Sequence, residues 1–484
     1  MEIIRHRDTL DRLTRPPGKL QSKLTAIRTH FCQRSHCQRI AMSCPSNYGG
    51  FQFTQKKDTN NDGANTVKFA DINGDKKIDL IVSRQNANLL DGNKMDIAFY
   101  QGYGDGTFSY IEKVTDQFHS TTRGPTTIAI GDLNNDGYPD VIGAYTDATT
   151  GTIISWFKND GGYETFGLPQ VIHQDTEIVP RCLAIQQLEV VDLNKDGFLD
   201  VVAACGTNIL WYQGIDKNGN FDPKAKFVSS DGSHSRRFQI IDVNKDSYPD
   251  VVVVQDKENS VAYYKNTEYS PSTDGKGSFD AAISMDTACK NAFDITSGDF
   301  NQNGWEDIAV ICEGDGRVVL YENNEGTFGY GKQIATTNKI SHQIESTDVN
   351  RDGYLDVVIR SLPTTQNSME GVVTWYDLNH NQGYVNDVYQ QIVGTDGIGN
   401  YLAIGDLNGD GFGDVTMSKD WISTSQTGFT LISVESCTAG SSGGGFGTFV
   451  LVVFIFGLIG GLGYLCWRWK KNRDNDFGDG FLSA

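Results

Sequence analysis

DLNKDGFLD, residues Asp192–Asp200, is the stretch that decides the fold, because the 484-residue chain contains six variants of it. The other copies are DINGDKKID (Asp71–Asp79), DLNNDGYPD (Asp132–Asp140), DVNKDSYPD (Asp242–Asp250), DFNQNGWED (Asp299–Asp307), DVNRDGYLD (Asp348–Asp356) and DLNGDGFGD (Asp406–Asp414). Successive copies start 61, 60, 50, 57, 49 and 58 residues apart. A repeat of this length is typical of structural units that stack or are arranged radially.

Each copy carries side-chain oxygens at positions 1, 3, 5 and 9, a pattern that suits a hard cation such as Ca²⁺. A carbonyl at position 7 and a turn glycine at position 6 fit the same site. An EF-hand would need Glu at position 12, where this chain has residues such as Val82 and Gly143. The predicted calcium ligands are Asp71, Asn73, Asp75, Asp79, Asp132, Asn134, Asp136, Asp140, Asp192, Asn194, Asp196, Asp200, Asp242, Asn244, Asp246, Asp250, Asp299, Asn301, Asn303, Asp307, Asp348, Asn350, Asp352, Asp356, Asp406, Asn408, Asp410 and Asp414.

Turn chemistry is the alternative explanation, since Asp, Asn and Gly also make ordinary turns. Seven copies in one register favour metal binding over turns alone. Three copies depart from the pattern: the first has Lys76 and Lys77, the fourth has Ser247 in place of Gly, and the fifth has Asn303 in place of a carboxylate. We therefore expect the second, third, sixth and seventh loops to bind calcium best.

Strand-like segments flank every loop, such as Thr127–Ile130 before one loop and Val251–Val254 after another. An aromatic-rich segment follows most loops, for example ILWYQ (209–213), and a Gly-x-Phe step such as Gly326–Phe328 then opens another strand. Four strands per repeat predict an all-β fold, a seven-bladed β-propeller with calcium loops. The aromatic residues are predicted to fill the core between blades, and residues 49–54 are predicted to complete the last blade.

This arrangement resembles FG-GAP (VCBS-type) repeat proteins, and the propeller is similar to the N-terminal propeller of integrin α subunits. The resemblance covers residues 46–436 and rests on the seven loops quoted above. It implies Ca²⁺ in those loops, on the lower rim, and it leaves the opposite face for a partner. The family includes adhesion receptors, lectins and a few enzymes, so the fold does not settle function. The leg domains of integrins have no counterpart in this chain.

A second strong signal lies near the C-terminus, where residues 446–467 contain no charge. About 20 apolar residues span a bilayer as a helix, which predicts one transmembrane α-helix. Arg468, Lys470 and Lys471 follow it and predict a cytosolic tail, that is, a single-pass type I membrane protein. Gly457 and Gly461 have the spacing that permits a homodimer through this helix.

The expected organisation has five parts. Residues 1–45 form a basic leader that is disordered or an artefact of the gene model, since they lack the apolar run of a signal peptide. The propeller spans 46–438, a Gly/Ser linker 439–445, the membrane helix 446–467 and the cytosolic tail 468–484. The net charge of the whole chain is −20, which disfavours a nucleic-acid partner.

Four cysteines stand at matching places around two loops. Cys182 and Cys205 flank the third loop at the same offsets at which Cys289 and Cys312 flank the fifth. This repetition predicts the disulfides Cys182–Cys205 and Cys289–Cys312, and hence an oxidising compartment. A third pair, Cys44–Cys437, is a hypothesis for a disulfide that closes the ring.

No nucleophile–histidine order, phosphate-binding loop or zinc spacing occurs in the sequence. We interpret the scattered histidines as ordinary loop residues and expect no enzymatic activity. The predicted function is a calcium-stabilised, single-pass membrane protein whose extracellular or lumenal propeller binds an unknown protein or glycan ligand, as adhesion proteins and receptors do. The first alternative is a membrane-anchored polysaccharide lyase or hydrolase, and the second is a purely structural role in the secretory pathway. A Tyr, Arg, His and carboxylate cluster in the central channel would favour the enzyme.

Overall fold

The computed structural model describes residues 53–434, with gaps at 59–63, 85–95, 116–121, 148–150, 162–165, 175–181, 183–184, 207, 230–234, 256–259, 268–278, 287–288, 338–339, 351, 363–371, 379–388, 395–400, 410, 412 and 419–428. The predicted leader, linker, membrane helix and tail lie outside these residues, as do Cys44 and Cys437. Within the described part, no helix has both the length and the apolar character that a membrane span requires.

The described residues form seven four-stranded antiparallel sheets and one two-stranded hairpin. The first three sheets contain β2 (Ala64–Ala70), β3 (Asp79–Arg84), β4 (Asp96–Gly102) and β5 (Phe108–Thr115); β6 (Thr122–Gly131), β7 (Asp140–Asp147), β8 (Gly151–Phe157) and β9 (Gln170–Gln174); and β10 (Ile185–Val191), β11 (Asp200–Cys205), β12 (Asn208–Tyr212) and β13 (Lys226–Ser229). The next two contain β14 (Ser235–Ile241), β15 (Asp250–Gln255), β16 (Ser260–Tyr264) and β17 (Ile283–Asp286); and β18 (Ala292–Gly298), β19 (Asp307–Cys312), β20 (Arg317–Tyr321) and β23 (Lys332–Thr336). The last two contain β24 (Ile340–Thr347), β25 (Asp356–Leu362), β26 (Val372–Tyr376) and β27 (Tyr389–Gly394); and β28 (Leu402–Gly405), β29 (Asp414–Ser418), β30 (Phe429–Val434) and β1 (Phe53–Asp58). The hairpin is β21 (Asn323–Asn324) with β22 (Thr327–Phe328).

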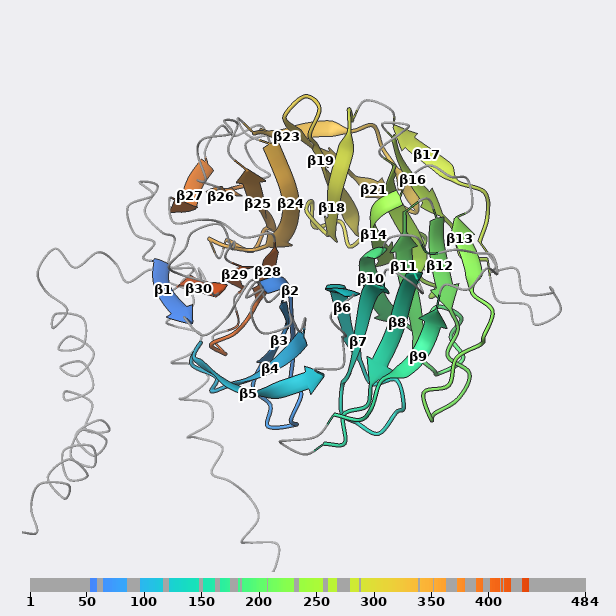
Figure 1. The fold of residues 1–484 in the computed structure, drawn as a ribbon. Coiled ribbons are helices and arrows are strands. Elements are labelled where there is room, and N and C mark those ends of the chain that lie inside the picture. Colours follow the sequence, from blue (N-terminus) through green and yellow to red (C-terminus); the bar gives the residue numbers. More distant parts are fainter. Residues whose placement is uncertain are drawn as a thin grey trace, which may run out of the picture. The chain divides into compact units, whose positions relative to one another are not determined.

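The sheets follow one another around a common centre, and the first strand of each lies innermost (Figure 1). Neighbouring inner strands touch in the order β2, β6, β10, β14, β18, β24 and β28, and β28 touches β2 again. All the strands lie in one compact unit, whereas a second unit, Cys44–Gln52 with Glu435–Ala484, lies outside the described residues. This arrangement is an all-β propeller, as the sequence predicts.

The last sheet is completed by the first strand. β1 pairs antiparallel with β30, so that Phe53 faces Val434 and Asp58 faces Phe429. The sequence predicts this pairing for residues 49–54, of which Phe53 and Thr54 lie in β1 and 49–52 lie outside the described residues. Because the first and last strands meet in one sheet, that sheet has no missing strand at its edge.

Hydrophobic cores lie between neighbouring sheets. The second strands are rich in Val, Ile and Ala and are buried along their length, as in β11, β15 and β19. One cluster packs Trp211 of one sheet against Phe238 and Tyr264 of the next. Trp156, Trp211 and Trp375 are at most 2% exposed. The prediction that the aromatic strands supply core between blades is confirmed.

Both predicted disulfides are present. Cys182 is bonded to Cys205, the last residue of β11, and Cys289 is bonded to Cys312, the last residue of β19. Each bond ties the second strand of a sheet to the chain just before the first strand. The equal offsets in sequence therefore reflect equal positions in two sheets.

Candidate functional site

The repeated loops share one backbone-capping pattern, which the third copy illustrates. The carboxylate of Asp192 accepts hydrogen bonds from the N–H groups of Asp196 (3.1 Å) and Gly197 (3.0 Å). Asn194 Oδ1 accepts from the N–H of Asp196 at 3.1 Å. Asp196 Oδ1 accepts from the N–H of Phe198 at 2.9 Å. The side chains at positions 1, 3 and 5 therefore all accept hydrogen bonds from backbone N–H groups of their own loop.

The carboxylate at position 9 accepts hydrogen bonds from different parts of the sheet. Asp200 is fully buried, and its Oδ2 accepts from the N–H of Leu193 at 2.9 Å while its Oδ1 accepts from the N–H of Gly214 at 2.8 Å. Gly214 follows β12, so this one carboxylate ties the loop to the end of the third strand. The bond to the N–H at position 2 recurs in all seven loops, through Asp79, Asp140, Asp200, Asp250, Asp307, Asp356 and Asp414.

Burial dominates the protonation of these position-9 carboxylates. It raises the pKa of Asp200 and of Asp140 to about 7, although backbone N–H groups lower both values. The same cause raises the pKa of Asp79 to about 6. A cation close by would favour the ionised form of each carboxylate. The side chain at position 9, which the sequence predicts as a calcium ligand, therefore mainly accepts hydrogen bonds from backbone N–H groups. The sequence pattern alone does not reveal that role.

The donor chemistry of the loops fits a hard cation. Asp71 Oδ1, at position 1 of the first loop, is buried and has no hydrogen-bond partner among the described residues. Carboxylate and amide oxygens are the ligands that Ca²⁺ prefers. In the described residues, no three or more His, Cys, Asp or Glu side chains are already gathered as a metal-holding group. Calcium in these loops stays a prediction.

Position 6 of the loop has left-handed backbone. Its φ is 90° for Gly197, 91° for Gly353, 68° for Lys76 and 76° for Ser247. Glycine adopts such values without strain, whereas an L-residue with a Cβ pays about 1–2 kcal/mol. The sequence-based expectation of a glycine-type turn at position 6 agrees with these angles, and the two departures, Lys76 and Ser247, are strained.

Replacing Ser247 by glycine is expected to raise the free energy of unfolding by about 0.5–1 kcal/mol, because relief of the strain exceeds the extra freedom of glycine in the unfolded chain. The converse change, Gly197→Ser, is expected to cost a similar amount, since a Cβ at Gly197 meets nothing within 4 Å and adds only conformational strain. Denaturation midpoints of the two variants measure both effects. Midpoints that moved in the same direction would contradict the assignment of strain to position 6.

Neighbouring loops also touch one another. Asn135 Nδ2, at position 4 of the second loop, donates to the carbonyl of Gly197 in the third loop at 3.1 Å. Gln302 Nε2 in the fifth loop donates to the carbonyl of Gly353 in the sixth at 2.7 Å. Lys245 Nζ lies 4.1 Å from the ring centre of Trp305 in the following loop. These contacts join the second loop to the third, and the fourth, fifth and sixth loops to one another.

A second candidate site is a hollow of about 240 Å³ lined by the inner strands. We call it the channel site, and its walls are Lys68, Thr127, Gln187, Leu188, Glu189, Arg237, Gln239, Asp294, Ile295, Gln343, Ile344, Glu345 and Tyr401. Every four-stranded sheet contributes, through its inner strand or, for Tyr401, the residue just before it. Most polar members stand three or five residues before a loop, because alternate residues of a strand share one face.

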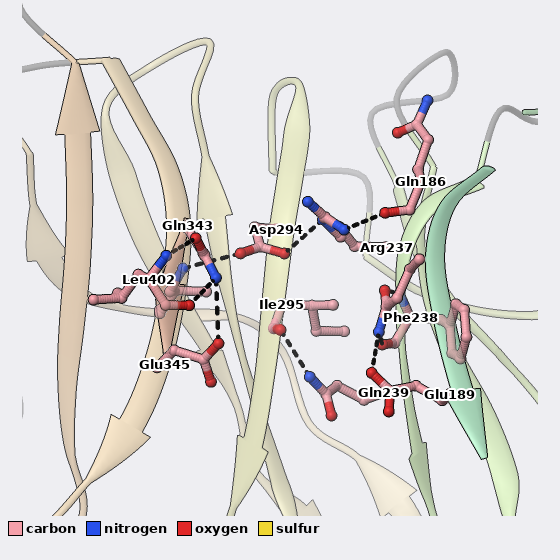
Figure 2. A network of polar contacts seen from close by, with 12 residues as sticks. Gln186, Glu189, Arg237, Phe238, Gln239, Asp294, Ile295, Gln343, Glu345 and Leu402 are labelled. Carbon is pink, nitrogen blue, oxygen red and sulfur yellow. Dashed lines mark hydrogen bonds and ion pairs between the residues drawn. The ribbon is translucent and has the colours of Figure 1, made fainter. Parts of the chain in front are cut away.

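Hydrogen bonds join the inner strands of neighbouring sheets around the channel site (Figure 2). Gln187 Oε1 accepts from the N–H of Phe238 and its Nε2 donates to the carbonyl of the same residue, both at 2.9 Å. Gln343 makes the equivalent pair of bonds with Leu402. Asp294 Oδ2 accepts from the N–H of Ile344 at 3.0 Å. Side chains five residues before a loop therefore fasten one blade to the next.

Charged residues of the channel site form two ion pairs. Lys68 Nζ lies 3.2 Å from Glu189 Oε1, and Arg237 Nε lies 3.5 Å from Asp294 Oδ1. Glu345 makes no ion pair among the described residues, and its one hydrogen bond is a 3.4 Å contact from Gln343 Nε2. Burial raises the pKa of Glu345 to about 7, with a further contribution from the Asp294 charge.

The channel residues were not predicted from the sequence. The signal was available, since they recur at fixed offsets before each loop, but many strands carry polar residues at such offsets on a solvent face. Two histidines that were predicted to be loop residues lie in strands instead. His173 belongs to β9, and His342 belongs to β24, where its Nε2 is 3.1 Å from Glu313 Oε1 and its ring stacks on Phe293 at 4.5 Å.

Comparison with known proteins supports the repeat and the fold. The family model described as FG-GAP-like repeat matches residues 71–143, 192–253, 242–310 and 299–359. The chain thus carries FG-GAP-like repeats within an all-β propeller. The comparison with curated proteins gives no match.

Three solved structures resemble the chain at low identity. They are an Agrocybe aegerita lectin that recognises non-reducing terminal N-acetylglucosamine (17% identity, TM-score 0.46, 71% of this chain and 81% of that chain), BBS1N in complex with ARL6DN (12%, 0.49, 81% and 98%) and the rhamnogalacturonan lyase YesW (12%, 0.46, 80% and 74%). These identities are too low for any activity to be transferred to this chain.

Proposed function

We propose that the chain is a calcium-stabilised, seven-bladed propeller on the extracellular or lumenal side of a membrane, where it binds a protein or glycan partner. The two disulfides carry this proposal, because such bonds persist in oxidising compartments and are rare in the cytosol. Residues 446–467 would anchor the propeller as a single span, with the tail in the cytosol. The loops would hold Ca²⁺ through positions 1, 3 and 5.

Calcium in this proposal supports the scaffold and not a reaction. Three carboxylates in most loops repel one another at short range, and a bound cation would remove that repulsion. The partner would occupy the face opposite the loops, where the connections between second and third strands and between neighbouring sheets lie. A binding role fits the fold of a rigid ring that presents many loops on one side.

A second candidate function is polysaccharide cleavage, because the channel site brings Tyr401 and Arg237 together with the carboxylates Glu189, Asp294 and Glu345. The enzymatic alternative expects tyrosine, arginine, histidine and carboxylates in the channel, and the walls of the channel site supply all of these except histidine. The ion pairs and inter-blade hydrogen bonds give three of these residues, Arg237, Asp294 and Glu189, a structural role already, which favours binding over catalysis.

Both candidates are tested by exposing the full-length chain to an array of glycans and polysaccharides, with calcium and with a chelator, and then measuring the length of the retained polysaccharides. The binding proposal expects calcium-dependent retention of particular glycans, or capture of a protein partner, with polysaccharide lengths unchanged. Shortened polysaccharides would establish the enzyme instead.

A further inference from the structure

The channel site adjoins a second hollow of about 310 Å³ at the seam between β2 and β28. Its walls include the apolar residues Val67, Phe69, Ile78, Ala403 and Ile404, together with Lys68, Glu345 and Tyr401. These last three residues also line the channel site. A polar hollow and a more apolar hollow therefore share one charged wall.

Formal charge in the shared region is unbalanced. Lys68 forms an ion pair with Glu189, and Arg237 forms one with Asp294. Glu345 is then the one carboxylate of the channel site without an ion pair among the described residues. A carboxylate taken from water without a partner is costly. The raised pKa of Glu345 shows this cost, because burial, Asp294 and Glu189 raise it more than Lys68 lowers it.

A metal ion is not the fitting cation at this place. Ca²⁺ takes about six to eight oxygen ligands, and the neighbouring carboxylates Glu189 and Asp294 are already engaged in ion pairs. Asp406 lines the second hollow but not the channel site. The Glu345 carboxylate, beside amide groups and a tyrosine, suits an ammonium group, which needs one negative charge and a few hydrogen-bond acceptors. Gln239, Gln343 and Tyr401 belong to the same walls, although Gln343 Oε1 already accepts a hydrogen bond from the N–H of Leu402.

We propose that this double hollow binds a small molecule with a primary ammonium group on an apolar body. The ammonium group pairs with Glu345, and the apolar body packs against Val67, Phe69 and Ile404. Gly405 helps to keep the seam open, because a Cβ there would lie 2.9 Å from Phe69. The site is lined by inner strands and by the loop residues Ile78 and Asp406, so the proposal does not depend on the proposed function.

The test uses two probes of nearly equal shape, 2-phenylethylamine and 2-phenylethanol, titrated into the full-length chain by calorimetry. The amine is expected to bind at least tenfold more tightly than the alcohol. Glu345→Gln is expected to weaken amine binding at least tenfold and to leave alcohol binding unchanged. Glu325→Gln, an exposed residue of another loop, is the matched control and is expected to change neither.

The pH dependence of amine binding is an independent test of the proposal. Amine affinity is expected to fall as pH drops below about 7, because Glu345 takes up a proton there, while Glu345→Gln shows no such fall. The other titratable or charged groups around the double hollow are Asp294, Glu189, Lys68, Tyr401, Arg237 and Asp406, and Glu345→Gln shows how much of the pH dependence comes from them. Equal binding of the two probes, amine binding unaffected by Glu345→Gln, or no amine binding at 10 mM, on the order of the weakest affinity expected for so small a ligand, would overturn the proposal.

Discussion

Asp200→Ala is expected to lower the free energy of unfolding by about 3 kcal/mol, a large effect for a single substitution. The change leaves the N–H groups of Leu193 and Gly214 buried without an acceptor, and each such group costs about 1–3 kcal/mol. Removal of a carboxylate that is itself costly to bury offsets part of the loss. The shift of the urea midpoint, with its slope unchanged, measures the effect.

Asp216→Ala is the matched control for this substitution. Asp216 lies in the loop between β12 and β13 of the same sheet and also accepts two backbone N–H bonds, from Asn218 and Asn220. Water can replace those bonds in an exposed turn, so the expected loss is below about 1 kcal/mol. Equal losses from the two substitutions would show that Asp200 does not tie the loop to the third strand.

The fold could be predicted because its main signals are local. Each nine-residue loop, the strands on either side and the aromatic strand after it lie within one repeat, so periodicity alone defines a blade. The pairing of β1 with β30 is a long-range contact, yet it was predictable because counting strands per repeat left the last blade one strand short. The disulfides were predictable for a similar reason, since equal offsets imply equal places in two sheets.

The role of position 9 was not predictable in the same way. The local sequence shows that Asp200 can supply oxygen ligands. It does not show that the Asp200 carboxylate accepts a hydrogen bond from Gly214, which lies after a later strand. The channel site could not be predicted from one repeat, because its residues come together only when the sheets close into a ring. Lys68 and Glu189 pair across 121 positions of sequence, and only closure of the inner strands around one centre brings them together.

Calcium removal is the second change with a large expected effect. A ligand present at about 100 times its dissociation constant stabilises the folded state by about 2.7 kcal/mol per site. Several occupied loops would therefore contribute on the order of 8 kcal/mol, and a chain of this size shifts its melting temperature by about 2 °C per kcal/mol. Chelation is thus expected to lower the melting temperature by roughly 10–20 °C.

Magnesium provides the control for this prediction. Mg²⁺ demands a smaller octahedral shell and gives up its water reluctantly, so a flexible loop with carboxylate, amide and carbonyl oxygens suits Ca²⁺ better. Adding Mg²⁺ to the chelated chain is expected to restore little of the lost stability, whereas adding Ca²⁺ restores it fully. Full recovery with Mg²⁺ would indicate general screening of the acidic loops.

The central claim is that the seven acidic loops are neutralised by calcium and thereby hold the propeller together. Thermal melting of the purified full-length chain, first saturated with Ca²⁺ and then stripped by a chelator, tests this claim most directly. We predict a melting temperature roughly 10–20 °C lower after stripping, reversed by added Ca²⁺. Coincident melting curves in the two conditions would contradict the claim.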